Sequence, residues 1–167
     1  LFSAASLVPC SGQDLMVAYA LGFEAGVRIG KASPGHHDAG WHLTGTLGTL
    51  AAGIASARLL RLDGSQTNYA LGIAATQSAG LQQNRGTMSK SFHAGKAAHN
   101  GLLAALLARE GFDSSTEIIE GRKGFSTTFA PRHESSAMTA QLGQTWEILS
   151  NGHKPYACGV VLHPLID

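Results

Sequence analysis

Charged residues are scarce in this sequence, and neither sign of charge dominates. Asp, Glu, Lys and Arg make up 14% of the 167 residues, and the formal net charge is +1. About a quarter of an ordinary domain is charged. A nearly neutral chain without a basic stripe is not expected to bind nucleic acid. So little charge also predicts that part of the surface is covered by further chain or by a second subunit.

Cysteines and long apolar runs are also rare. The two cysteines, Cys10 and Cys158, form no C-x-x-C pair, which excludes a disulfide framework and favours a reducing compartment, the cytoplasm. The longest stretch without charge, residues 39–57, contains Trp41, His42 and repeated Thr and Gly. Such a composition is poorly suited to the roughly 20 apolar residues of a membrane span. We therefore expect a soluble protein with no membrane partner.

Acidic residues are absent between Asp63 and Glu110. The same window contains four basic residues, which are Arg85, Lys90, Lys96 and Arg109. Cations without a local counter-charge are suited to binding an anion. The helix that we expect to begin at Ala94 would direct its free N–H groups at the same place. The alternative is a solvated basic loop with no ligand.

The hydrophobic pattern predicts one mainly α domain with four long helices. We expect these helices at residues 11–31, 44–62, 66–82 and 94–110, with short helices at 115–120 and 124–130. Residues 83–93 and 132–140 are expected to be loops, and Trp146–Leu149 to form a short strand. The expected core includes four large residues, which are Leu47, Ile54, Leu102 and Leu106.

Small residues recur every fourth position in the first long helix, at Ala18, Gly22, Gly26 and Gly30. Each glycine costs about 1 kcal/mol relative to alanine in a helix, so we expect this seam to pack closely on another helix. Ser11 and Asp14 have the spacing of a capping box at the start of this helix. Glu24 and Arg28 are predicted to pair on its more exposed face.

Three histidines lie close together in residues 36–42. His42 precedes a helix by one or two residues, where the positive helix end lowers the pKa of an imidazole and favours a neutral base. A capping or linking role for His42 is the alternative. His36 and His37 are adjacent and lack further ligands at metal-binding spacing, so we do not expect a metal site. Lys154, between His153 and Pro155, is open to the same two interpretations as His42.

Three separate motifs, taken together, resemble the MmgE/PrpD family. The first is residues 40–48 (GWHLTGTLG), the second is residues 86–98 (GTMSKSFHAGKAA), and the third is residues 154–158 (KPYAC) followed by His163-Pro164. The resemblance extends along essentially the whole chain. Known members of this family include 2-methylcitrate dehydratase, cis-aconitate decarboxylase and an iminodisuccinate epimerase.

The resemblance implies a large all-helical domain, a smaller α+β lid, a homodimer, and no metal or organic cofactor. Residues 1–150 would be the central part of the helical domain, and residues 151–167 the hinge into the lid. The implied active-site residues are His42, Lys90, His93 and Lys154. We expect the two lysines to bind carboxylates, His42 to transfer protons, and His93 to orient or assist.

The implied substrates are small di- or tricarboxylates, and we expect dehydration of 2-methylcitrate, a step of propionate metabolism. A decarboxylase-like or an epimerase-like member is the alternative within the family. An upstream Asp-Asp-Thr-His-type motif and the lid have no counterpart in this sequence, and Gly159 stands where some members place His or Cys. We therefore also expect the piece alone to be inactive, and a non-catalytic remnant that only folds or dimerises remains a second class of function.

Overall fold

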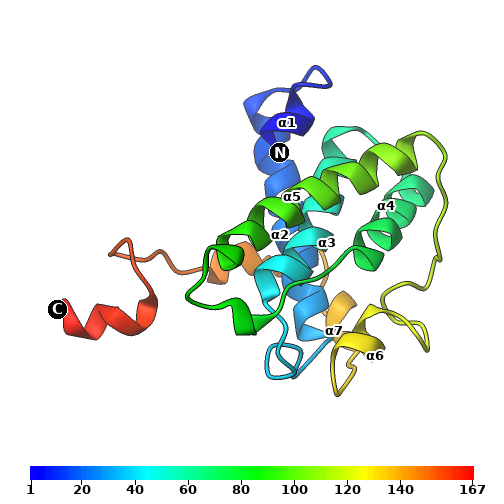
Figure 1. Ribbon diagram of the computed structural model, residues 1–167. Helices are drawn as coiled ribbons and strands as arrows, with labels where there is room; N and C mark the ends of the chain where they lie inside the picture. Colours follow the sequence, from blue (N-terminus) through cyan, green and yellow to red (C-terminus); the bar gives the residue numbers. More distant parts are fainter.

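The computed structural model describes all of residues 1–167, and the chain is mainly α-helical (Figure 1). The four long helices are α2 (Gly12–Lys31), α3 (Leu43–Leu59), α4 (Gly64–Thr76) and α5 (Met88–Arg109). The short helices are α1 (Phe2–Ala5), α6 (Phe125–Phe129) and α7 (Ser136–Thr139), with the 3-10 helices η1 (Gln82–Asn84), η2 (Glu147–Ser150) and η3 (Val160–Leu165). The mainly α prediction is confirmed.

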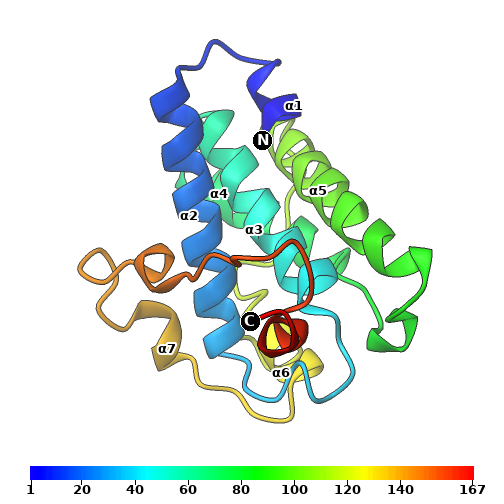
Figure 2. The same ribbon diagram turned by 90° about the vertical axis from the view of Figure 1, so that its left-hand side faces the viewer.

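Helix α3 occupies the centre of the bundle and packs against α2, α4 and α5 (Figure 2). Its neighbours approach closely because small residues lie at the contacts. A Cβ placed on Gly22 of α2 would lie 2.6 Å from the carbonyl oxygen of Ala51 in α3. A Cβ placed on Gly101 of α5 would lie 2.6 Å from the backbone nitrogen of Gly53. The predicted close packing of the α2 seam is thus present.

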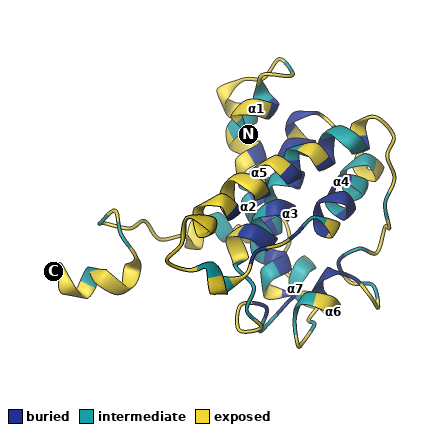
Figure 3. Cartoon of the chain, in the orientation of Figure 1, coloured by how far each residue is buried: buried dark blue, intermediate teal, exposed yellow.

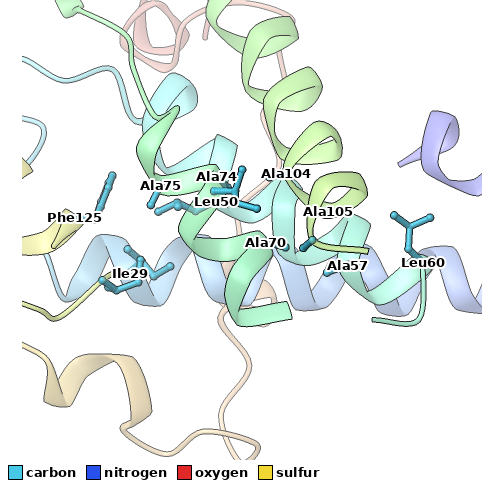
Figure 4. Packing of buried hydrophobic residues seen from close by; sticks show 13 residues of the cluster. Ile29, Leu50, Ala57, Leu60, Ala70, Ala74, Ala75, Ala104, Ala105 and Phe125 are labelled. Atoms are coloured by element: carbon cyan, nitrogen blue, oxygen red, sulfur yellow. The ribbon is translucent and has the colours of Figure 1, made fainter. Parts of the chain in front are cut away.

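The buried core is made largely of alanine (Figure 4). Leu50 is its largest side chain with no exposed surface, and Ile29 and Phe125 are buried but slightly exposed. The four large residues expected in the core, Leu47, Ile54, Leu102 and Leu106, are each only partly buried. Closely spaced helix axes leave room for small side chains at the centre of each contact, so larger side chains are displaced towards the edges.

Two long helices begin at capping boxes. At the start of α2 the Ser11 side chain accepts a hydrogen bond from the Asp14 N–H, and Asp14 accepts one from the Ser11 N–H. These hydrogen bonds from Ser11 hold the pKa of the Asp14 carboxyl below its ordinary value. Asp63 and Gln66 form the equivalent box at the start of α4. Both starts follow from local sequence, and the box at Ser11 and Asp14 is the one that was predicted.

Several expected boundaries are wrong. Helix α5 begins at Met88, so Lys90 and His93 are helical and do not lie in a loop. Helix α4 ends at Thr76, short of the expected residue 82. Residues 115–120 form turns in place of a helix, while the helix expected at residues 124–130 is present as α6.

The predicted strand at Trp146–Leu149 is also wrong, because residues 147–150 form η2. The loop expected at residues 132–140 contains the short helix α7. The one pairing of extended backbone in the structure is the isolated bridge between Trp41 and Leu81. A strand needs a partner, and here the Glu147 N–H donates to the Glu24 carboxylate at 2.7 Å instead. None of the helices is both long enough and apolar enough to cross a membrane.

The pair of Glu24 and Arg28 is buried, contrary to the expectation of an exposed face. Arg28 Nε donates to Glu24 Oε1 at 2.5 Å, and each residue is 4% exposed. The remaining guanidinium donors reach the carbonyl oxygens of Ala140 at 2.7 Å and Thr145 at 3.0 Å. This ion pair therefore holds the segment around α7 and η2 onto α2.

Substituting Glu24 by Gln is expected to lower the free energy of unfolding by about 3–5 kcal/mol, because Arg28 would keep a buried charge without its counter-ion. Urea denaturation followed by circular dichroism measures this change. The matched control is Lys31→Gln, which removes a partly exposed partner of Glu147 and should cost less than about 1 kcal/mol. Equal effects of the two substitutions would contradict a buried, structural ion pair.

Substituting Gly101 by Ala is expected to destabilise the protein by about 1–3 kcal/mol, because the new methyl group overlaps the backbone of α3. Gly95→Ala is the control in the same helix, since no atom lies within 4 Å of a Cβ placed there. That variant should gain up to about 1 kcal/mol from helix propensity. Thermal denaturation of both variants tests the difference, and a stabilised Gly101→Ala variant would contradict the close packing.

Candidate functional site

Two segments far apart in the sequence are tied together beside the first turns of α3 and α5. The His42 N–H donates to the Gly80 carbonyl oxygen at 2.9 Å, and the Gln82 N–H donates to the Gly40 carbonyl oxygen at 2.9 Å. The Gln82 side-chain amide also donates to the Trp41 carbonyl oxygen at 3.1 Å. These bonds fix the loop before α3 against the loop before α5, and so bring the ends of the two helices together.

His42 and His93 meet at this junction. Their Nδ1 atoms lie 2.8 Å apart, with His42 as the N-cap residue of α3 and His93 within α5. Gly80 supports the contact: it has φ of +149°, and a Cβ there would lie 3.2 Å from the Nδ1 atom of His93. The structure thus joins two histidines that the sequence separates by two helices.

The short contact couples the protonation of the two rings. One Nδ1 atom donates its proton and the other accepts it, so a single proton occupies the space between them. When His42 donates, its Nε2 atom carries a lone pair and can act as a base. When His42 accepts, its Nε2 atom carries the proton. The pair can therefore take up a proton at the Nε2 atom of one ring, while the proton between the Nδ1 atoms moves to the other ring.

Burial and nearby positive charge together favour the neutral form of His42. Burial is the main cause that lowers the pKa of His42 below 6.5, and His93, Lys90, Arg85 and His37 lower it further. No acidic residue lies in the first turn of α5, and neither Arg85 nor Lys90 forms an ion pair within the chain. The helix end itself carries a partial positive charge. The site is therefore electrostatically prepared for an anion.

Lys90 and Lys154 occupy different surroundings. Lys90 lies in the first turn of α5, three residues before His93, and is exposed. Lys154 is also exposed, and its Nζ atom donates to the Cys158 carbonyl oxygen at 3.2 Å. Residues 151–167 leave the helical body and are mostly exposed (Figures 1 and 3). The structure thus places Lys90 beside the histidine pair and Lys154 in a contact with its own segment.

His36 has a structural role. Its ring is buried, with Nε2 2.7 Å from the Thr46 hydroxyl and Nδ1 3.2 Å from the Phe129 carbonyl oxygen. Burial lowers the pKa of His36, so the neutral ring donates from Nδ1 to Phe129 and accepts from Thr46. No cluster of three metal-ligating side chains is present in the chain.

His37 contacts Arg85, an association that no pattern in the sequence predicts. The Arg85 Nη2 atom lies 2.9 Å from the His37 Nε2 atom. The sequence marks Arg85 only as one of the basic residues between Asp63 and Glu110, a stretch that contains no acidic residue. A contact between residues 37 and 85 depends on the pairing of the two loops and could not be read from either loop alone.

A cavity of about 540 Å³ lies elsewhere, between α2, α3, α4 and the segment around α7. Its wall is mostly apolar, and it includes none of His42, Lys90, His93 and Lys154. The Glu24–Arg28 pair at its edge has its hydrogen bonds within the protein. Arg58 also lines this cavity and forms no ion pair within the chain, but no histidine lies in the wall. The candidate site for proton transfer is therefore the histidine pair and its cations.

Comparison with known proteins shows similarity over nearly the whole chain. Residues 1–137 match the family model of the MmgE/PrpD N-terminal domain. The chain is 38% identical over 168 residues to a cis-aconitate decarboxylase-like protein, oryM, of Aspergillus oryzae, covering 94% of this chain and 35% of that protein. It is 37% identical over 167 residues to the cis-aconitate decarboxylase of Aspergillus terreus, covering 94% and 34%.

The human cis-aconitate decarboxylase is also similar, with 30% identity over 122 residues, which cover 72% of this chain and 25% of that protein. The chain spans about a third of the length of the fungal relatives that it matches. Lys154 lies outside the residues that match the family model.

Substituting Lys90 by Gln is expected to raise the pKa of His42 towards 6.5, because one of the charges that disfavour the imidazolium is removed. Histidine ring signals followed by NMR across a pH titration measure this, with a His42→Gln variant to assign the resonance. Lys96→Gln is the control in the same helix, since Lys96 does not contribute to the shift. An unchanged His42 titration in the Lys90 variant would contradict the electrostatics of the site.

The same lowered pKa sets the sign of a stability effect. His42 binds a proton more weakly in the folded chain than in the unfolded chain, where its pKa has the ordinary value of 6.5. Its contribution to stability is therefore fully present above pH 6.5 and is lost as the pH falls through the folded-state pKa.

Proposed function

The chain belongs to the MmgE/PrpD family, and from this premise we propose that it contributes the histidine site of a lyase for small di- and tricarboxylates. Decarboxylation of cis-aconitate is the reaction that the names of its relatives favour. The observation that carries the proposal is the 2.8 Å contact between His42 and His93. It supplies a proton-transfer pair next to cations that have no counter-charge.

Substrate binding depends on charge in this proposal. A carboxylate would accept charge-assisted hydrogen bonds from Lys90 and from the free N–H groups of the first turn of α5. Bound carboxylates would also oppose the positive charges that lower the pKa of His42. The protonated form of the histidine pair would therefore become more populated when the site is occupied.

The chemical step needs a stabilised carbanion and one proton. When the bond between the departing carboxylate and its CH₂ carbon breaks, carbon dioxide leaves and the electron pair remains as an allylic carbanion. Nearby cations stabilise this charge, which is often the largest catalytic contribution. The protonated pair then delivers one proton to the carbanion through His42, and solvent restores that proton afterwards.

Dehydration of 2-methylcitrate is the second candidate, and the neutral state of His42 favours it. A neutral imidazole can remove the proton next to a carboxylate, and His93 can share the resulting positive charge through the Nδ1 contact. The proton taken from carbon would then be returned to the departing hydroxyl group as water forms. An epimerase would use the same removal and return the proton on the other face.

The organisation of the whole protein is part of the proposal. Residues 1–150 would belong to the helical domain and residues 151–167 to a hinge, from which Lys154 would reach the substrate in the assembled enzyme. We propose a cytoplasmic homodimer, because both cysteines are unpaired and α2 exposes the apolar side chains of Met16, Val17 and Tyr19. No cofactor is required by the chemistry proposed.

Turnover of cis-aconitate and of 2-methylcitrate, followed by ¹³C NMR, tests the proposal. The product of the complete gene and this chain are assayed side by side. His42→Gln is expected to lower kcat by about 10²–10⁴-fold, as the loss of a proton-transfer group does. Lys90→Ala should cost roughly 1.5–3 kcal/mol in transition-state stabilisation, because a carboxylate loses its charged partner.

Lys96→Ala is the control for a general loss of positive charge from α5 and should keep nearly full activity. Helical content and melting temperature are measured for every variant. Both are expected to stay close to those of the unmodified protein, because His42 and Lys90 contribute little to the core. Full activity in the Lys90 and His42 variants would contradict the assignment. If the complete gene product turned over neither substrate, the chain would fit the non-catalytic alternative.

A further inference from the structure

Arg85 is held in place without a counter-ion. Its Nη2 atom donates to the His37 Nε2 atom at 2.9 Å, and this is its one side-chain hydrogen bond within the chain. A guanidinium can only donate, so the His37 Nε2 atom is the acceptor of this hydrogen bond. On its other side, the His37 Nδ1 atom lies 3.5 Å from Asp38 Oδ1. Asp38 is thus directed at His37 and forms no ion pair with Arg85.

The scaffold that orients Arg85 is the one that holds the histidine pair. Gln82 begins η1 and ties its side-chain amide to the carbonyl oxygens of His37 and Trp41. The Arg85 N–H donates to the Gln82 carbonyl oxygen at 2.9 Å, directly after η1. Gly86 follows with φ of +83° and turns the chain into α5. His42 and Arg85 are therefore carried by the same pair of joined loops.

A comparison with Arg28 shows what a structural arginine looks like in this chain. Arg28 is buried, and its donors are used by Glu24 and by carbonyl oxygens. Arg85 is exposed, has one hydrogen bond, and leaves most of its N–H donors free. Its positive charge is close enough to His42 to act on it in the same direction as Lys90. Arg85 is thus available to an anion, and it differs from Arg122 in being held by the joined loops that also carry His42.

We propose that Arg85, positioned by His37, binds a second carboxylate of the substrate and makes the site selective for tricarboxylates over dicarboxylates. This inference rests on the proposed function, and it adds a residue and a basis for specificity. Lys90 is a point charge at the start of α5. Arg85 presents a planar fork that can take both oxygens of one carboxylate. His37 restricts the orientation of the fork and so acts as a positioning residue.

Binding of tricarballylate, a saturated tricarboxylate that cannot undergo the reaction, tests the proposal without turnover. Titration calorimetry on the product of the complete gene compares the unmodified protein with Arg85→Gln and Arg122→Gln. Arg122 is the matched control, because it is exposed and has no ionic partner in the chain. Arg85→Gln should weaken tricarballylate binding by roughly 10–100-fold, the effect of losing one charge-assisted pair.

Selectivity is measured by repeating the titrations with glutarate, a dicarboxylate. The ratio of glutarate Kd to tricarballylate Kd should fall about 10-fold in Arg85→Gln, since a dicarboxylate depends less on a further cation. The ratio should be unchanged in Arg122→Gln. Equal loss of affinity for both ligands would overturn the specificity role, because Arg85 would then contribute no more to the tricarboxylate than to the dicarboxylate.

The role of His37 is separated by two variants. His37→Leu removes the acceptor for Arg85 and should reproduce part of the loss of tricarballylate affinity. His37→Gln retains a side-chain oxygen that can accept from a guanidinium and should restore most of it. Melting temperatures exclude unfolding as the cause. If His37→Leu binds like the unmodified protein, the positioning role is wrong.

The outcomes distinguish this inference from the proposed function. If the unmodified protein binds tricarballylate and turns over a substrate while Arg85→Gln behaves like Arg122→Gln, the inference fails and the proposed function stands. If the unmodified protein neither binds tricarballylate nor turns over cis-aconitate or 2-methylcitrate, both fail.

Discussion

The close approach of α2 and α5 to the central helix α3 is the constraint on which the rest of the structure depends. It is possible because Gly22 and Gly101 place no side chain between the helix backbones. The close spacing leaves room only for small side chains, so most of the buried core is alanine. Alanine has little apolar surface to bury, so stability depends on the density of contacts between the helices. A larger side chain at either glycine would separate the helices and change the relation between their ends.

That relation creates the site. His42 caps α3 and His93 lies in the second turn of α5, so their 2.8 Å contact exists only when the two helices keep their spacing. Gly80 continues the same principle outside the helices, because its missing side chain leaves space for the His93 ring. Packing and chemistry are therefore coupled: the residues that allow close packing also allow two imidazoles to share a proton.

The distribution of charge separates structural cations from those available to a ligand. Arg28 is neutralised in the interior by Glu24 and fastens the chain around α7 and η2 to α2. Arg85 and Lys90 remain without counter-ions beside His42, and they lower its pKa together with the main effect of burial. Two unpaired cations on joined elements beside a histidine pair favour an anion at this place.

The sequence by itself determined the helical class, the starts of α2 and α4, and the family, because capping boxes, helical periodicity and contiguous motifs are local properties. It also identified the residue types of the site. The tertiary structure decided that Glu24 and Arg28 are buried, that α5 begins at Met88, and that His42 meets His93. Each depends on contacts between segments distant in the chain, whose spacing no local pattern encodes.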